Sequence, residues 1–266
     1  MPASSHWLAA RPLLIGMLHV PPLPGSARFA GSLDAISERV LADAEVLVSS
    51  GFECLMLENF GDLPFFPDVV PNITVAHMTA IAERVRTKFS QARLGLNVLR
   101  NDGCAALSIA HAVRADFIRV NVLCGARVTD QGLITGIAHD LLRLRANLHA
   151  ENIAILADVD VKHSAPLGVR EIGVEVQDLI ERAGADAVIV SGTATGQPVD
   201  FAKLQRVAEV AGTTPVLIGS GATADTIANI LKLASGAIVG SSLKVEGCVT
   251  NPVDLHRARE FVAAAR

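Results

Sequence analysis

Aromatic residues, excess basic charge and long apolar runs are all lacking in this sequence. Tyrosine is absent and aromatic residues make up 4% of the 266 positions, so few side chains are available to stack on nucleic acid bases. The net charge of −4 excludes the basic field that is typical of nucleic acid-binding proteins. No apolar run reaches the ~18 residues that span a bilayer, so any membrane contact is expected to be peripheral.

Cysteine is also scarce, and its spacing indicates no metal or redox chemistry. The sequence has no C-x-x-C pair, and its four cysteines are Cys54, Cys104, Cys124 and Cys248. We therefore expect reduced thiols and a cytoplasmic protein. The first residues, "MPASSHWLAARPLLIG", lack the basic segment and apolar core of a secretory signal.

Short apolar runs are present along the whole chain, and they alternate with amphipathic helical patterns. The runs lie at residues 13–20, 53–59, 93–99, 117–122, 153–160, 187–192, 215–221 and 236–242. Strands this apolar are typical of parallel sheets that are buried on both faces. Eight strand–helix units in 266 residues favour a single closed (β/α)8 TIM barrel over an open doubly wound sheet. We predict one domain over residues 1–266, with the barrel at about 12–264.

The predicted connections differ in length at the two ends of the strands. Helix-to-strand links such as "RAD" and "GTT" are short, whereas strand-to-helix links such as "VPPLPGSARFAGS" and "FGDLPFFPDVVPN" are long. This asymmetry predicts a site at the carboxyl ends of the strands, where TIM barrels carry their active sites. The second long loop contains Asp62, Phe65 and Phe66, and we expect it to close over the site or to contact a second subunit. A homo-oligomer is predicted.

The fifth predicted strand ends in an alternating polar series within "ILADVDVKHS". Alternation along the strand puts Asp158, Asp160 and Lys162 on the face opposite Val159 and Val161. Because the helix-facing side of a barrel strand is apolar, we expect the charged face to point inward. Asp158 and Lys162 are predicted to be a proton-transfer pair bridged by substrate, since their α-carbons are about 13 Å apart on a strand. In an alternative, Lys162 forms a Schiff base with a sugar carbonyl.

Polar residues at the carboxyl ends of other strands converge on the same rim. Burial of unpaired polar groups costs several kcal/mol, which favours a functional reason for the convergence. His19 and Glu58 are predicted to be further catalytic residues. The predicted substrate-binding residues are Asn59, Asn97, Arg119, Asn121, Asp160 and His163. Two structural alternatives stay open: an ion pair of Arg119 with Glu58 or Asp158, and a packing role for His19.

A divalent metal is a further alternative, held by Asp158, Asp160, His163 and Glu58. On a regular strand the adjacent Lys162 and His163 point to opposite faces, which disfavours this ligand set. We predict no metal residue, and the sequence requires no cofactor.

Glycine–serine turns follow the last strands, in "LIGSGAT" and "IVGSSLK". TIM barrels commonly bind phosphate after strands seven and eight, where glycines expose backbone amides and a helix N-terminus adds positive charge. The turn after the sixth strand, in "SGTATGQP", is expected to extend this cradle. A small phosphorylated substrate is therefore predicted, bound by Ser191, Gly192, Thr193, Gly219, Ser220, Gly221, Gly240, Ser241 and Ser242.

Many ordered blocks of the sequence resemble the BtpA family over nearly the whole chain. They include "IGMLHVPPLPG", "LENFGDLPFFP", "FIRVNVLCGARVTDQG", "ADVDVKHS" and "VSGTATGQP". The resemblance implies a fold similar to phosphate-binding TIM barrels, and it supports a site without supplying its chemistry. Positions typical of the family are Glu58, Asp62, Asn97, Arg100, Asn121, Asp130, Asp158, Lys162 and His163.

Two functions follow from these features. The first is an enzyme that acts on a phosphorylated sugar or nucleotide-like metabolite by acid–base or Schiff-base chemistry, of the lyase, isomerase or glycosyl-bond-cleaving type. The second, which the resemblance implies, is a non-catalytic photosystem I biogenesis factor, peripheral on membranes. The convergent polar rim favours the enzyme, because an assembly factor needs no such cluster.

Overall fold

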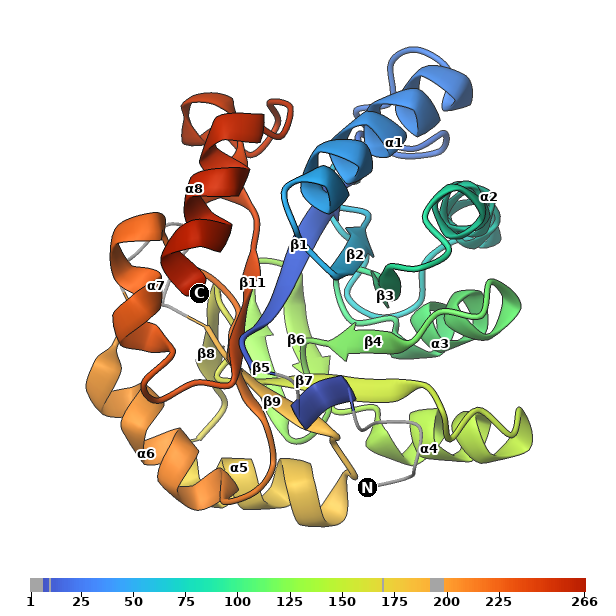
Figure 1. The fold of residues 1–266 in the computed structure, drawn as a ribbon. Helices are drawn as coiled ribbons and strands as arrows, with labels where there is room; N and C mark the ends of the chain where they lie inside the picture. Colours follow the sequence, from blue (N-terminus) through green and yellow to red (C-terminus); the bar gives the residue numbers. More distant parts are fainter. Residues whose placement is uncertain (1–6, 10, 169, 192–198) are drawn as a thin grey trace.

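Eight parallel strands close into a barrel in the computed structural model, which describes residues 7–9, 11–168, 170–191 and 199–266. The strand order around the barrel is β1-β11-β10-β9-β7-β4-β3-β2, and β2 returns to β1 (Figure 1). The strands are β1 Leu13–His19, β2 Cys54–Glu58, β3 Arg93–Asn97, β4 Phe117–Val120, β7 Ala154–Val159, β9 Ala187–Val190, β10 Val216–Ile218 and β11 Gly236–Val239. Each lies within one of the predicted apolar runs. The predicted TIM barrel is confirmed.

Helices form a ring outside the barrel (Figure 1). They are α1 Leu33–Ser49, α2 Asn72–Lys88, α3 Gly103–Ala112, α4 Ala138–Asn147, α5 Ile172–Gln177, α6 Phe201–Ala211, α7 Ala224–Ile230 and α8 Leu255–Ala265. Asp102, Asp200 and Asp254 accept backbone N–H groups at the starts of α3, α6 and α8. These caps satisfy donors that the first helical turn leaves unpaired.

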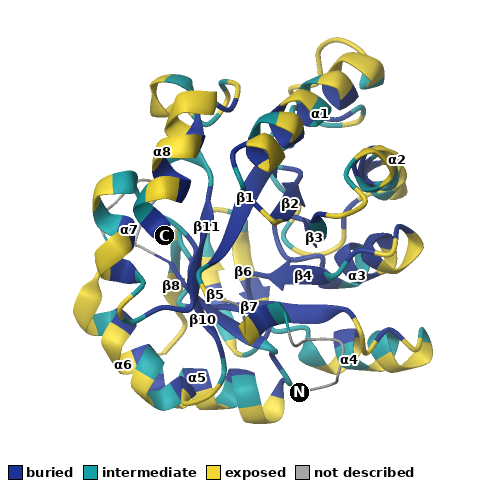
Figure 2. Ribbon diagram, viewed as in Figure 1, coloured by how far each residue is buried: buried dark blue, intermediate teal, exposed yellow. Residues whose placement is uncertain are grey.

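The hydrophobic core has two layers that follow the alternation of the strands. In β7, Ala154 and Leu156 belong to the cluster inside the barrel. Ile155, Ala157 and Val159 belong to the larger cluster between the strands and the helices. Figure 2 shows the result, with buried strands inside and helices exposed on their outer sides. The predicted inward and outward faces of this strand are therefore correct up to Val159.

The amino-terminal end of the barrel is filled by side chains. The Trp7 and Phe117 rings pack with centroids 5.4 Å apart, and the Arg93 guanidinium lies 5.1 Å from the Trp7 ring. Gly95 leaves room for this packing, because a Cβ there would lie 2.1 Å from the Phe117 ring. Among the described residues, this packing occupies the amino-terminal end of the barrel.

A small antiparallel sheet lies beyond the barrel, and the sequence analysis did not predict it. It joins β5 Ala126–Thr129, β6 Gly132–Thr135 and β8 Ser164–Pro166, in the order β6-β5-β8. Because β5 and β6 follow β4, and β8 follows β7, the sheet belongs to the carboxyl ends of the strands. Among the described residues no helix is long and apolar enough to cross a membrane.

Candidate active site

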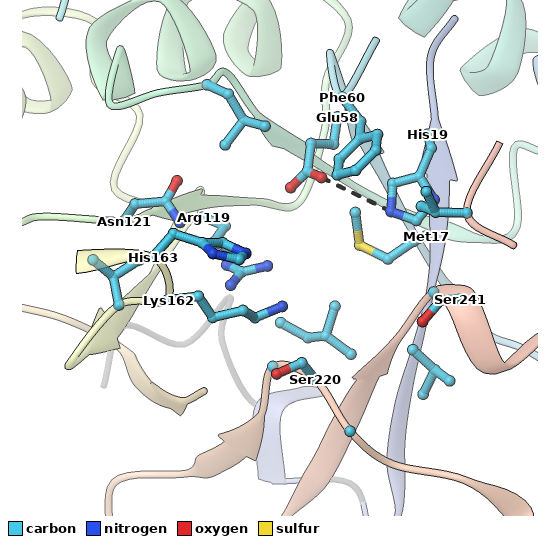
Figure 3. Close-up of a pocket in the computed structure, with 18 of the residues that line it drawn as sticks. Met17, His19, Glu58, Phe60, Arg119, Asn121, Lys162, His163, Ser220 and Ser241 are labelled. Atoms are coloured by element: carbon cyan, nitrogen blue, oxygen red, sulfur yellow. Dashed lines mark ion pairs between the residues drawn. The ribbon is translucent and has the colours of Figure 1, made fainter. Parts of the chain in front are cut away.

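A cavity of about 690 Å³ opens at the carboxyl ends of the barrel strands. Side chains that follow strands on all sides of the barrel line it (Figure 3). Those from the predicted site are His19, Glu58, Arg119, Asn121, Lys162, His163, Gly219, Ser220, Gly221, Gly240, Ser241 and Ser242. The convergence predicted from the sequence is thus present in the structure.

Lys162 extends into the middle of this cavity, between Glu58 and Ser220 (Figure 3). The pKa of its amine is lowered to about 8, chiefly by burial and also by the neighbouring Arg119, against the pull of Asp158 and Glu58. No carboxylate oxygen of the described residues lies within 4 Å of the amine. An amine with this pKa exchanges protons near neutral pH, as a general acid or a Schiff-base nucleophile must.

Glu58 faces the same cavity from the end of β2 and is 6% exposed. Burial raises the pKa of its carboxyl, although Arg119 and Lys162 oppose the shift. His19 lies beside it on β1, with Nε2 3.9 Å from a Glu58 oxygen. Burial lowers the pKa of His19 to about 3, so the imidazole is neutral and the contact is not an ion pair at neutral pH.

Asp158 does not line the cavity, which corrects its predicted role in direct proton transfer. Its carboxylate is 0% exposed. It accepts Arg119 Nε and Nη2 at 3.1 and 2.9 Å, Asn121 Nδ2 at 2.7 Å and Ser191 Oγ at 3.3 Å. With its oxygens occupied, Asp158 orients Arg119 and Asn121. The structural alternative for Arg119 is therefore present, and the same side chain also lines the cavity.

Three other predicted contacts also lie behind the cavity wall. Asn97 donates to the Arg119 backbone oxygen at 2.9 Å and to Asn121 Oδ1 at 3.3 Å. Asn59 accepts the Leu99 N–H at 2.7 Å and does not line the cavity. Ser191 bonds Asp158, as above. These residues support the groups that line the cavity and do not line it themselves, and their contact with substrate or phosphate stays a prediction.

Asp160 and His163 depart from the predicted strand geometry. β7 ends at Val159, and Asp160 and His163 have left-handed backbone, with φ of 55° and 52°. Asp160 therefore turns away from the cavity and forms ion pairs with Arg127 and Lys203, which corrects its predicted substrate contact. His163 lines the cavity together with Lys162, contrary to the expectation that the two point apart.

The ligands of the metal alternative do not converge, because Asp160 and Asp158 do not line the cavity that Glu58 and His163 share. Within the described ranges, no group of three or more His, Cys, Asp or Glu residues is arranged to hold a metal ion.

The two glycine–serine turns form one wall of the cavity. Gly219–Gly221 follows β10 and Gly240–Ser242 follows β11. Ser242 Oγ donates to the Ala222 backbone oxygen at 2.9 Å and joins the two turns. A Cβ at Gly240 would lie 2.7 Å from the His19 ring, so glycine is needed for the close packing. Gly192 and Thr193, predicted to extend the cradle, lie outside the described residues.

Several lining residues were not assigned to the predicted site. Phe60, Leu63 and Phe65 line the cavity from the loop after β2, whereas Asp62 and Phe66 do not, and closure of this loop over the site stays a prediction. Asp130 and Gln131 reach the cavity from the turn between β5 and β6. Arg100 reaches it from the segment after β3. The remaining unassigned lining residues are Met17, Leu99, Val161, Ala222, Thr223, Ile238, Val239, Gly247 and Val249. Arg100 was visible as a family-typical position directly after a predicted strand.

The closed barrel, with its cavity at the carboxyl ends of the strands, is similar in fold to solved TIM-barrel structures. KGPDC from Streptococcus mutans has a TM-score of 0.58 at 14% identity, covering 96% of this chain and 98% of that chain. N-(5'-phosphoribosyl)anthranilate isomerase from Pyrococcus furiosus has a TM-score of 0.56 at 13% identity, covering 96% of this chain and 98% of that chain. At these identities the likeness shows the fold alone.

The chain belongs to the BtpA family, whose model matches residues 10–266. It is 49% identical to an uncharacterized protein of Thermococcus kodakarensis, with 95% of each chain covered. It is 46% identical to the photosystem I biogenesis protein BtpA of Synechocystis, with 94% of this chain and 87% of that protein covered. The resemblance seen in the sequence is confirmed.

Proposed function

We propose that this protein is an enzyme that acts on a small phosphorylated sugar or nucleotide-like metabolite by acid–base chemistry. One observation carries the proposal: Glu58, which is buried, and Lys162, which is partly buried, both have shifted pKa values and face the same cavity as the glycine–serine turns. Opposed titratable groups with perturbed pKa values in a cleft are typical of catalytic sites.

The phosphate is proposed to bind at Gly219–Gly221 and Gly240–Ser242. Backbone amides at such turns, together with serine hydroxyls, suit the oxygens of a phosphate. The relation of this wall to strands β10 and β11 matches the position at which TIM barrels commonly bind phosphate. Anchoring the phosphate there would present the rest of a small substrate to Lys162 and Glu58 across the cavity.

Glu58 and Lys162 are the proposed proton-transfer groups. With a pKa of about 8, the Lys162 ammonium is mostly charged at pH 7 and serves as the acid. Glu58, whose pKa is raised by burial, serves as the base. Raised and lowered values of this kind bring a carboxylate and an amine closer to the working pH. Asp158 acts through Arg119 and Asn121, which it holds toward the substrate.

The Schiff-base route uses the same lysine. The neutral Lys162 amine would attack the carbonyl carbon of a sugar, and the carbonyl oxygen would leave as water after proton transfer. Borohydride reduction of the enzyme with its substrate separates the two routes, because it labels Lys162 covalently only if the imine forms.

The proposal is tested by incubating the parent protein with a panel of phosphorylated metabolites and their dephosphorylated counterparts. We expect depletion of a phosphorylated compound and no depletion of its counterpart. Ser241→Asp, which puts a negative charge in the proposed phosphate site, should weaken binding of that compound at least tenfold. Turnover of the dephosphorylated compound alone, or unchanged binding by Ser241→Asp, would refute the phosphate assignment.

The second candidate function is a role in photosystem I biogenesis, with the protein bound peripherally to membranes. The observation that favours it is the name of the Synechocystis relative, which is 46% identical. A role of this kind needs the surface of the protein and not the amine of Lys162. Lys162→Met would therefore leave it intact while it abolishes the proposed catalysis.

A further inference from the structure

Arg100 is a buried cation that lines the cavity without a carboxylate partner. It is 8% exposed, and its Nη2 donates to the Lys162 backbone oxygen at 2.6 Å. No carboxylate oxygen of the described residues lies within 4 Å of its guanidinium, and its Nε and Nη1 make no hydrogen bond to those residues. Buried charges in proteins are normally paired.

Two other buried arginines near the site show the normal arrangement. Arg119 pairs with Asp158 at 2.9 Å. Arg127 pairs with Asp160 at 2.9 Å and also with Glu175. The contrast indicates that Arg100 is kept free of an internal partner, as a binding group for an anion would be.

Arg100 follows a barrel strand that is distant in the strand order from those before the glycine–serine turns. It follows β3, while the turns follow β10 and β11. In the barrel order, β3 and β10 are four strands apart in either direction, with β9, β7 and β4 between them on one side and β11, β1 and β2 on the other. The backbone at Arg100 and the backbone of the turn after β10 therefore lie on opposite sides of the barrel.

We propose, building on the proposed function, that the substrate carries a second anionic group, a carboxylate or a second phosphate, which binds Arg100 opposite the glycine–serine turns. A guanidinium offers two parallel N–H groups to either anion. Lys162 and Glu58 then face the part of the substrate between its two charged ends.

Crystals soaked in sodium selenate test this proposal through the anomalous signal of selenium. The parent should show two sites, one at Ser220 and Ser241 and one at Arg100. Arg100→Met should lose only the second site and Ser241→Asp only the first, while Arg100→Lys, which keeps the charge, should retain both. Arg127→Met is the matched control, since it removes a buried arginine that has carboxylate partners, and it should keep both sites.

The outcomes separate this inference from the proposed function. Selenate at the turns alone would overturn the second site and leave the phosphate assignment standing. Selenate at Arg100 alone would refute the phosphate assignment. Soaking with glycolate in the presence of selenate distinguishes the two anions: loss of selenium at Arg100 alone shows that this position takes a carboxylate, and two retained sites show that it prefers a phosphate-like anion. A second site that persists in Arg100→Met would overturn the proposal.

Discussion

At the residue scale, the charged groups of the site differ in whether a partner of opposite charge lies beside them. Asp158 is saturated by Arg119 and Asn121, whereas Lys162 is partly buried with no carboxylate within 4 Å among the described residues. The first arrangement stabilises charges that are already present. The second keeps an amine reactive and destabilises the folded protein, which is typical of groups retained for function.

Replacement of Lys162 by Met should therefore stabilise the protein at pH 7. A lowering of the pKa from 10.5 to about 8 corresponds to roughly 3 kcal/mol of unfavourable burial, of which we expect about 1–3 kcal/mol to be recovered. Because the folded state releases this proton first, the unfolded state binds more protons between pH 8 and 10.5 and the parent gains stability as the pH rises through this window. Calorimetric unfolding at pH 7 and pH 10 should show the difference between Lys162→Met and the parent shrinking at pH 10.

Lys203→Met is the matched control for that measurement. Lys203 is a partly buried lysine that forms an ion pair with Asp160, so its loss should not raise stability. If Lys162→Met is no more stable than the parent at pH 7, the Lys162 amine does not destabilise the folded protein, which contradicts this prediction.

Sequence alone could predict which side of each strand faces inward, but not which inward groups reach the cavity. Glu58 and Asn97 are register partners on β2 and β3, and only Glu58 lines the cavity. Asn97 is held by the backbone of Arg119 and by Asn121. Such choices depend on contacts between strands far apart in the chain, and the spacing of polar residues does not encode them.

At the element scale, the eight strands were predictable because each is a compact apolar run. The sheet of β5, β6 and β8 was not, because "ARVTDQGLIT" is short, polar and lies in an expected loop. Its alternation of Val128 and Ile134 around a turn with Gly132 in left-handed conformation is the signal that was available. The departure of Asp160 from the strand pattern has the same cause, since the chain leaves β7 there to enter β8.

A buried ion pair attaches the segment after β11 to α1. Lys244 is 1% exposed and donates to Asp43 at 2.6 Å, and the other Asp43 oxygen accepts the Val253 N–H at 2.8 Å. Lys244 therefore lies neither at the surface nor in the lining of the cavity. Because Lys244 lies three residues after Ser241, the ion pair is placed to hold the glycine–serine turn Gly240–Ser242 in position.

Asp43→Ala should destabilise the protein by about 3–5 kcal/mol, because it leaves the Lys244 ammonium buried without a partner. Denaturant unfolding measures the change. The paired replacement Asp43→Leu with Lys244→Met removes both charges and should recover at least half of the loss. A loss below about 1 kcal/mol for Asp43→Ala would show that the pair does not hold this segment.

At the scale of the whole molecule, packing by Trp7 and Phe117 leaves a cavity at one end of the barrel only, and the Phe-containing loop and the β5–β6 turn line that cavity. Lys162, Glu58 and the glycine–serine turns line this cavity together. The cytoplasmic location and the homo-oligomer stay predictions. The assembly role does not account for this enclosed polar site.

Turnover by Lys162→Met is the most direct test of the account. It is measured on the phosphorylated compound that the parent depletes, beside Lys203→Met, after both variants are shown to be folded. We predict that Lys162→Met loses at least a hundredfold in turnover and still binds the compound, while Lys203→Met keeps the parent rate. Turnover by Lys162→Met at the parent rate would contradict the assignment of Lys162 and the catalytic function built on it.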